Sequence, residues 1–119
     1  MRYQPDYHIF KNTTYALKGL KDIIQTETSF KIELILAVFL IPVIFFVDVS
    51  LTHKIIMFIT LMGVLIAETT NSSIERVVDL VTLEHNEMAG RAKDVGSTIV
   101  FLSILLFVVT WGLILMDAY

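Results

Sequence analysis

Hydrophobic and polar positions divide the chain into an amphipathic N-terminal segment and three apolar runs. The longest run, 95–116, holds 22 consecutive uncharged residues, and about 20 residues suffice for a helix to cross the hydrocarbon core of a membrane. The runs 34–47 and 55–67 hold 14 and 13 uncharged residues, a length that also suits buried helices of a globular core. Because 119 residues offer too little polar surface to cover three such helices, the pattern predicts three transmembrane helices, at about 30–47, 53–70 and 94–116.

The polar segment before the first run predicts a helix on the membrane surface, over about 7–26. At about 100° per residue, its apolar side chains share one arc and three lysines gather beside that arc. The apolar members are Ile9, Phe10, Leu17, Leu20, Ile23 and Ile24, and the basic ones are Lys11, Lys18 and Lys21. Such a helix lies in the headgroup plane of an anionic leaflet. It serves either as an anchor or as part of a site.

Composition supports a membrane protein and excludes several other classes. Hydrophobic residues make up 55% of the chain, charged residues 18%, and the mean hydropathy is +0.74. Disulfide scaffolds, thiolate zinc sites and cysteine nucleophiles are excluded because there is no Cys. A net charge of -3 provides no basic field for nucleic acid. We therefore expect a single all-α integral membrane domain, residues 1–119, with no nucleic-acid partner.

The distribution of Lys and Arg predicts the orientation of the chain. Five of these residues lie in 1–33, three in 68–94, one at Lys54 and none in 117–119. Three spans put eight of the nine on one side, which the positive-inside rule makes cytoplasmic. The N-terminus and the 68–94 region are therefore expected in the cytoplasm, with Trp111 and Tyr119 as interfacial anchors near the other face.

The most informative polar pattern follows the second apolar run. Its members fall at i, i+3, i+4, i+7 and i+11, so a helix would gather them within about 100° of arc; they are Glu68, Asn71, Ser72, Glu75 and Asp79. Glu68 lies at the membrane edge or below it, where an ionised carboxylate is costly unless paired, protonated or coordinated. Carboxylates on one face repel unless a cation lies among them, and Mg²⁺ prefers such oxygen ligands.

Further candidates surround this pattern, and each has an alternative interpretation. Glu27 and Glu33 lie at similar depth near the start of the first span, whereas Asp79, Glu84 and Glu87 also suit a solvated helix face. Lys93 could meet a lipid headgroup or a nucleotide phosphate. The residues alone thus predict a cytoplasm-facing, cation-binding carboxylate site at a membrane surface, without naming a reaction.

Two strings extend the interpretation, ETTNSSIERVVD at 68–79 and GRAKDVGS at 90–97. Together with Lys18–Gly19–Leu20, Glu27 and the three-span layout, they resemble the prokaryotic diacylglycerol kinase family from about residue 8 to residue 111. The resemblance implies a homotrimer in the bacterial inner membrane whose active sites are shared between subunits near the cytoplasmic interface. It further implies transfer of the γ-phosphate of ATP, bound with Mg²⁺, to the hydroxyl of diacylglycerol, giving phosphatidic acid.

The resemblance also implies roles for individual residues. Glu68 matches the catalytic base, Glu27 and Glu75 match metal ligands, and Asn71 and Asp79 match supporting polar positions. Positions that match ATP contacts are His8, Tyr15, Glu27, Glu75, Glu84, His85, Asn86, Lys93 and Asp94. Positions that match the lipid site are Leu17, Lys21, Phe30, Lys54, Glu68 and Ser97.

The sequence departs from the family at three positions and is compatible with three functions. His8, Leu17 and Leu80 stand where many family members have Arg, Trp and Arg, and a largely neutral His8 is a poor phosphate contact. The GRAKDVGS string resembles the diacylglycerol branch of the family, and undecaprenol kinase is the alternative within it. A non-enzymatic cation-conducting or assembly subunit built around Glu68 is the alternative from another class.

Overall fold

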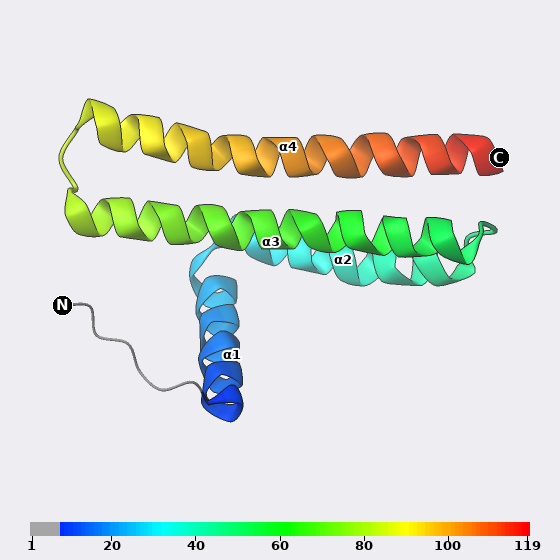
Figure 1. Cartoon of the computed structure of the whole chain (residues 1–119), viewed down its shortest axis with the longest axis horizontal. Coiled ribbons are helices and arrows are strands. Elements are labelled where there is room, and N and C mark those ends of the chain that lie inside the picture. The colour runs from blue at the N-terminus through cyan, green and yellow to red at the C-terminus, as the bar shows by residue number, and fades with distance from the viewer. Residues whose placement is uncertain (1–7) are drawn as a thin grey trace.

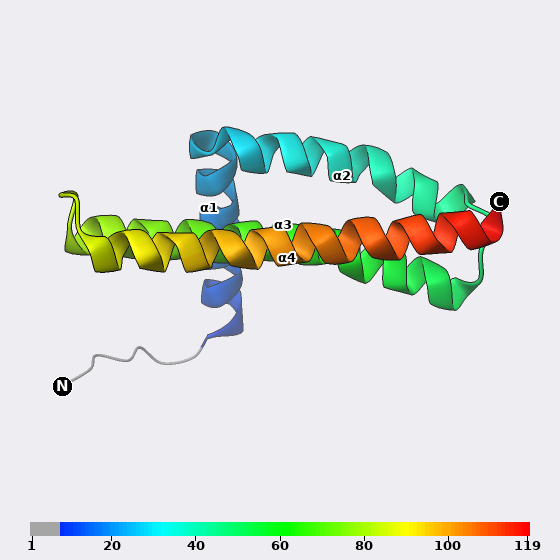
Figure 2. The same ribbon diagram turned by 90° about the horizontal axis from the view of Figure 1, so that it is seen from above.

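A computed structural model describes residues 8–119 and contains four α-helices (Figure 1). They are α1 (Ile9–Thr26), α2 (Thr28–Phe46), α3 (Leu51–Val81) and α4 (Glu87–Ala118). The last three run antiparallel in sequence order, with α3 between α2 and α4, while α1 crosses their direction (Figures 1 and 2). The expected all-helical fold is confirmed. Residue 7, where we expected the surface helix to begin, lies outside the described residues.

Local capping and backbone geometry account for where these helices begin. Ser50 Oγ accepts a hydrogen bond from the backbone N–H of His53 (3.2 Å) ahead of α3. Asn86 Oδ1 accepts one from the N–H of Ala89 (3.0 Å) ahead of α4. Each satisfies one of the backbone donors that a helix leaves unpaired at its first turn. Between α1 and α2 the backbone of Glu27 is extended, with φ −122° and ψ 110°, so the chain turns there without a loop.

Three of the helices are long and apolar enough to cross a membrane, as the hydrophobic pattern predicted: α2, α3 and α4. Two of them continue beyond the expected spans, because α3 runs on to Val81 and α4 begins at Glu87. The 31 residues of α3 correspond to about 46 Å, against about 30 Å of hydrocarbon. The C-terminal turns of α3 and the first turns of α4 therefore extend past the apolar layer.

A narrow apolar core joins the three long helices, and Trp111 belongs to it. Its side chain is 6% exposed, and its Nε1–H donates to Met57 O (3.1 Å) and Thr60 Oγ1 (3.2 Å) on α3. The prediction that Trp111 is an interfacial anchor is wrong. A buried indole N–H needs an acceptor, and α3 supplies one inside the bundle.

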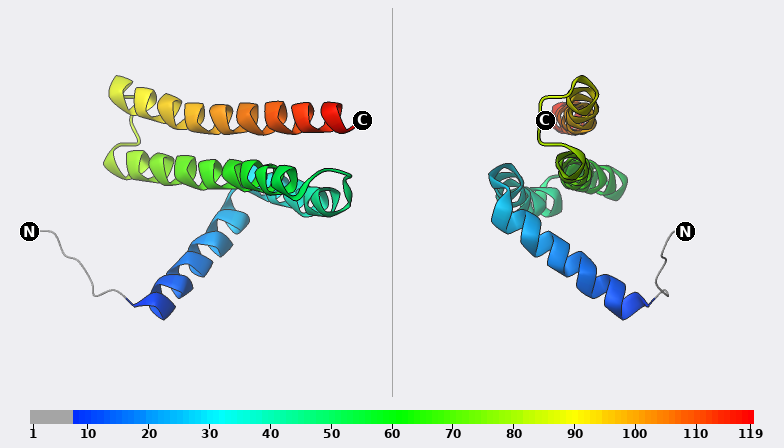
Figure 3. Two further views of the ribbon diagram at one scale, coloured as in Figure 1. Left: turned by 45° about the vertical axis from the view of Figure 1, so that its right-hand side comes forward. Right: turned by 90° about the vertical axis from the view of Figure 1, so that its left-hand side faces the viewer.

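The first helix stands apart from the bundle. It leaves the N-terminal end of α2 and runs obliquely to the other helices (Figure 3), and Ile23 is its one buried residue among Ile9–Thr26. Its orientation across the other helices is compatible with the predicted position in the headgroup plane. Little apolar packing holds it to the rest of the chain.

A close approach between α3 and α4 occurs at Gly96, which is buried. A Cβ atom at this position would clash with Asn71 Oδ1 and lie 3.6 Å from Ile74 Cδ1. Only glycine permits this spacing, because a methyl group would force Asn71 or the whole of α4 to move.

We expect Gly96→Ala to lower the free energy of unfolding by about 1–3 kcal/mol, the usual cost of overpacking. Gly112→Ala is the matched control on the same helix, since a Cβ there has nothing within 4 Å, and alanine favours a helix over glycine. Thermal unfolding in detergent measures both. Equal midpoints for the two variants would contradict the close approach.

Candidate active site

The polar residues predicted to form one stripe all lie on α3, which is a single continuous helix. At 1.5 Å per residue, Glu68 lies about 26 Å from the start of α3 at Leu51, near one edge of a hydrocarbon core about 30 Å thick. Glu75 and Asp79 follow two and three turns later. The helix therefore carries one carboxylate at the membrane edge and two beyond it.

Glu27 joins this stripe from the junction of α1 and α2. Ser72 Oγ donates a hydrogen bond to Glu27 Oε1, and Arg76 Nη2 lies 3.5 Å from the same oxygen. Ser72 is buried and Glu27 half-buried. These contacts fix the carboxylate of Glu27 beside the turn of α3 that lies between Glu68 and Glu75, although the two segments are 45 residues apart.

Glu27 and Glu75, the two predicted metal ligands, are too few to hold Mg²⁺ without further oxygen ligands from a substrate or water. Asn71 Nδ2 donates to Glu75 Oε1 over 3.5 Å, which orients that carboxylate, while Asn71 Oδ1 is buried without a partner among residues 8–119. No cluster of three or more His, Asp or Glu occurs in that described range. Mg²⁺ commonly takes one or two protein carboxylates and completes its shell with substrate phosphates and water, so Glu27 and Glu75 fit such a site.

A second carboxyl group meets Glu68 within the bundle. Glu33, on α2, is close enough to hydrogen-bond Glu68, and its Oε2 atom is buried with no partner within the described chain. Two ionised carboxyl groups so close together would repel each other. The structure thus brings Glu33, considered only as a further candidate from the sequence, to the predicted base.

A pocket of about 380 Å³ lies at the connection between α3 and α4. Four of the predicted ATP-contacting residues line this connection pocket: Glu84, His85, Asn86 and Lys93. Asp79 also lines it and binds Lys93, with 2.7 Å between Lys93 Nζ and Asp79 Oδ1. Asp94 is exposed and does not line the pocket.

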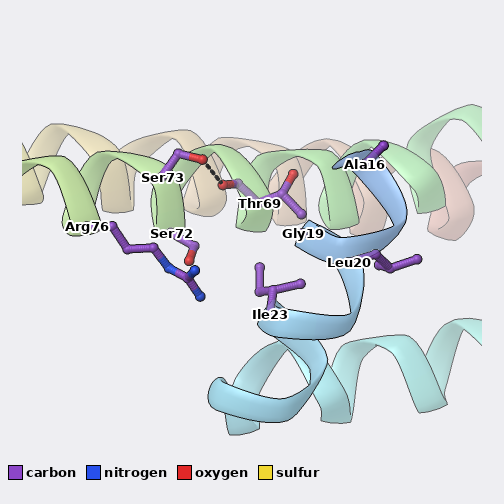
Figure 4. Close-up of a pocket in the computed structure, with 8 residues that line it drawn as sticks. All are labelled: Ala16, Gly19, Leu20, Ile23, Thr69, Ser72, Ser73 and Arg76. Carbon is purple, nitrogen blue, oxygen red and sulfur yellow. Dashed lines mark hydrogen bonds between the residues drawn. The ribbon is translucent and has the colours of Figure 1, made fainter. Parts of the chain in front are cut away.

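A groove of about 370 Å³ separates α1 from α3 (Figure 4). The α1 side is mostly apolar, and the α3 side carries three hydroxyl groups and a guanidinium. The residues are Ala16, Gly19, Leu20 and Ile23 from α1, and Thr69, Ser72, Ser73 and Arg76 from α3. The groove is therefore amphipathic and lies beside the helical turn that carries Glu68.

The remaining predicted site residues do not converge within one chain. His8, Tyr15, Leu17 and Lys21 are exposed along α1 or just before it, Ser97 is exposed on α4, and Phe30 is buried in the core. Lys54 lies at the opposite end of α3, about 21 Å along the helix from Glu68, where its Nζ donates to Phe45 O (2.9 Å).

Sequence reasoning missed the polar contacts that hold α1 to α3. Arg76 Nη1 binds Asp22 Oδ2, and Arg76 Nη2 donates to Thr26 Oγ1 (3.1 Å). The partners are 54 and 50 residues apart, so no helical spacing reveals them. Charge complementarity between Asp22 and Arg76 was the available signal.

Comparison with known proteins identifies relatives of this chain. The family described as prokaryotic diacylglycerol kinase matches residues 14–115. The chain is 40% identical to a diacylglycerol kinase of Haemophilus influenzae over 108 residues, covering 91% of this chain and 92% of the relative. It is 35% identical to a diacylglycerol kinase of Escherichia coli strain K12 over 107 residues, covering 90% and 88%. An undecaprenol kinase of Bacillus subtilis is 32% identical over 88 residues, covering 74% and 72%.

These similarities extend over the carboxylates of α3, the α1–α2 junction and the connection pocket alike, because the match runs from residue 14 to residue 115. The non-enzymatic alternative considered from the sequence is therefore set aside. Three helices able to cross a membrane accompany the match. The chain belongs to the prokaryotic diacylglycerol kinase family and is a bacterial membrane kinase.

Proposed function

We propose that this protein transfers the γ-phosphate of ATP to the hydroxyl of 1,2-diacylglycerol and so produces phosphatidic acid at the cytoplasmic face of the inner membrane. The observation that carries the proposal is the bond between Ser72 and Glu27. It brings the carboxylate of the α1–α2 junction to the helix that bears Glu68 at the membrane edge and Glu75 beyond it. A carboxylate at the membrane edge suits a base for a lipid hydroxyl, and carboxylates nearer the water suit ligands of a metal ion bound to a nucleotide.

In this proposal Glu68 is the general base. A diacylglycerol hydroxyl cannot rise far above the lipid interface, and the oxygen of a proton acceptor must come within about 2.6–3.2 Å of the hydroxyl oxygen whose proton it removes. The depth of Glu68 on α3 meets that requirement. The amphipathic α1–α3 groove beside it offers hydroxyl groups to the glycerol backbone and apolar side chains to the acyl chains.

The nucleotide would occupy the connection pocket, further from the membrane. Lys93 would exchange its bond to Asp79 for nucleotide phosphates, and the Glu84–Asn86 segment would contact the remainder of ATP. Glu27 and Glu75 would hold Mg²⁺, which neutralises phosphate charge as the phosphoryl group moves. The protein's own contribution is to align the hydroxyl, the base and the γ-phosphate.

A homotrimer would complete this site. Within one chain His8 and Tyr15 lie on or next to α1 and do not line the connection pocket; in a trimer they would contact the nucleotide of a neighbouring subunit. The exposed apolar side chains of α2 and α4, such as Phe39 and Leu106, suit contact with lipid or with another subunit.

Undecaprenol is the alternative acceptor, because an undecaprenol kinase is among the relatives. We expect purified protein with labelled ATP and a bacterial lipid extract to label phosphatidic acid. Separate assays with diacylglycerol and with undecaprenol then give the ratio of kcat/KM. A preference for undecaprenol would replace the proposed substrate, whereas labelling of no lipid would overturn the proposal.

We expect Glu27→Gln and Glu75→Gln each to raise the Mg²⁺ concentration for half-maximal activity by at least about 10-fold, because an amide removes charge from a hard-cation site. Glu87→Gln is the control, since Glu87 is an exposed carboxylate of α4 outside the site. Activity measured across a Mg²⁺ titration distinguishes them. A variant with an unchanged titration curve would show that its carboxylate is not a ligand.

We expect Glu68→Gln to lower kcat by about 10²–10⁴-fold, the usual contribution of a positioned proton acceptor. The KM for ATP should change little, because the phosphates bind nearer to Glu75 and Lys93. Assembly should be retained, since loss of a charge at the membrane boundary removes a desolvation cost. Single-turnover phosphorylation and trimer yield in detergent measure the two effects. Poor assembly with normal chemistry per trimer would indicate a structural role instead.

A further inference from the structure

Arg76 connects three acceptor groups at the point where α1 meets α2. One nitrogen, Nη1, binds Asp22, and the other, Nη2, reaches Thr26 Oγ1 at 3.1 Å and Glu27 Oε1 at 3.5 Å. Asp22 and Thr26 lie in the last turns of α1, and Glu27 follows directly. The planar fork of a guanidinium is well suited to hold several acceptors in fixed relative positions.

The remaining attachment of α1 to the bundle is slight. Ile23 is the one buried side chain of α1. From Ile23 back to Ala16, the groove separates α1 from α3 (Figure 4). Arg76 lines that groove from the α3 side. The orientation of α1 at its last turn therefore depends on Ile23 and on the bonds made by Arg76.

Electrostatics link this attachment to Glu27. Asp22 and Glu27 bring two carboxylates to one side of the junction, and without a cation between them they would repel each other. The guanidinium between them removes that repulsion and, with Ser72, leaves Glu27 Oε1 in a defined position. The Arg76 side chain is 47% exposed, so its ion pairs with Asp22 and Glu27 add little to the stability of the fold. Their main effect is on the position of the Glu27 carboxylate.

We propose that Arg76 is a positioning residue: with Asp22 it fastens the last turn of α1 to α3 and so holds Glu27 in place for the metal ion and nucleotide. The inference rests on the proposed function, because it assigns Arg76 to the Glu27 site described above. It differs from a purely structural clamp in what it predicts. Loss of Arg76 should weaken metal-nucleotide binding more than it affects assembly or the chemical step.

The test compares variants of the full chain in detergent. We expect Arg76→Ala to raise the Mg²⁺ concentration for half-maximal activity about 3- to 10-fold, the range for loss of one charge-assisted contact, with kcat within about 2-fold. Calorimetric binding of Mg²⁺ with β,γ-methylene-ATP should weaken by a similar factor. Arg76→Lys, which keeps the charge but loses the fork, should recover part of the loss.

Two further variants make the test specific. Asp22→Asn removes the partner on α1 and should shift the Mg²⁺ dependence in the same direction, and its effect should largely disappear when Arg76 is already alanine. If Arg76→Ala fails to assemble, Asp22→Asn alone still tests the inference. Arg91→Ala is the control, because Arg91 is an exposed arginine of α4 with no ion pair within residues 8–119.

Several results would overturn the inference. If the wild type is active and Arg76→Ala changes neither the Mg²⁺ dependence nor nucleotide binding, the role proposed for Arg76 is wrong. The proposed function would then still stand. A fall in trimer yield alone, or additive effects of Asp22→Asn and Arg76→Ala, would reduce Arg76 to a structural contact. A wild-type protein without nucleotide binding or lipid phosphorylation would overturn the proposed function and this inference with it.

Discussion

A helix of 31 residues is about 46 Å long, whereas the hydrocarbon core of a bilayer is about 30 Å thick. Because α3 is continuous, it carries polar groups from the membrane edge into the water as one rigid element. Glu68 lies where the apolar layer ends, and Glu75 and Asp79 follow on successive turns. The relative depth of the groups that would handle a lipid and those that would handle a nucleotide therefore follows from helical rise alone.

Other elements supply what one helix cannot. The antiparallel return through Asn86 places Lys93 opposite Asp79, and the break at Glu27 turns that carboxylate toward Ser72. Both contacts depend on the packing of α3 between its neighbours. That packing includes the glycine contact at Gly96 and the indole bond from Trp111 to α3. Interactions inside the membrane thus hold together a polar site at its edge.

Within one chain, not all of the residues expected at the site come together. Residues of α1 expected at the nucleotide, such as Tyr15, are exposed and do not line the connection pocket, while many apolar side chains of the bundle are exposed. Both features suit a site shared between subunits. Polar contacts such as that of Arg76 with Asp22 also attach α1, which has little apolar packing in its own chain.

The sequence by itself determined the number of spans, the helical stripe beginning at Glu68 and the family, because hydrophobic run length, helical periodicity and local motifs are properties of adjacent residues. The tertiary structure decided what depends on residues far apart in the chain. It brought Glu27 to Ser72 and Arg76, placed Glu33 beside Glu68, and buried Trp111 instead of leaving it at the interface. The physical reason is that burial and ion pairing depend on how helices pack, and no periodicity within one helix encodes that packing.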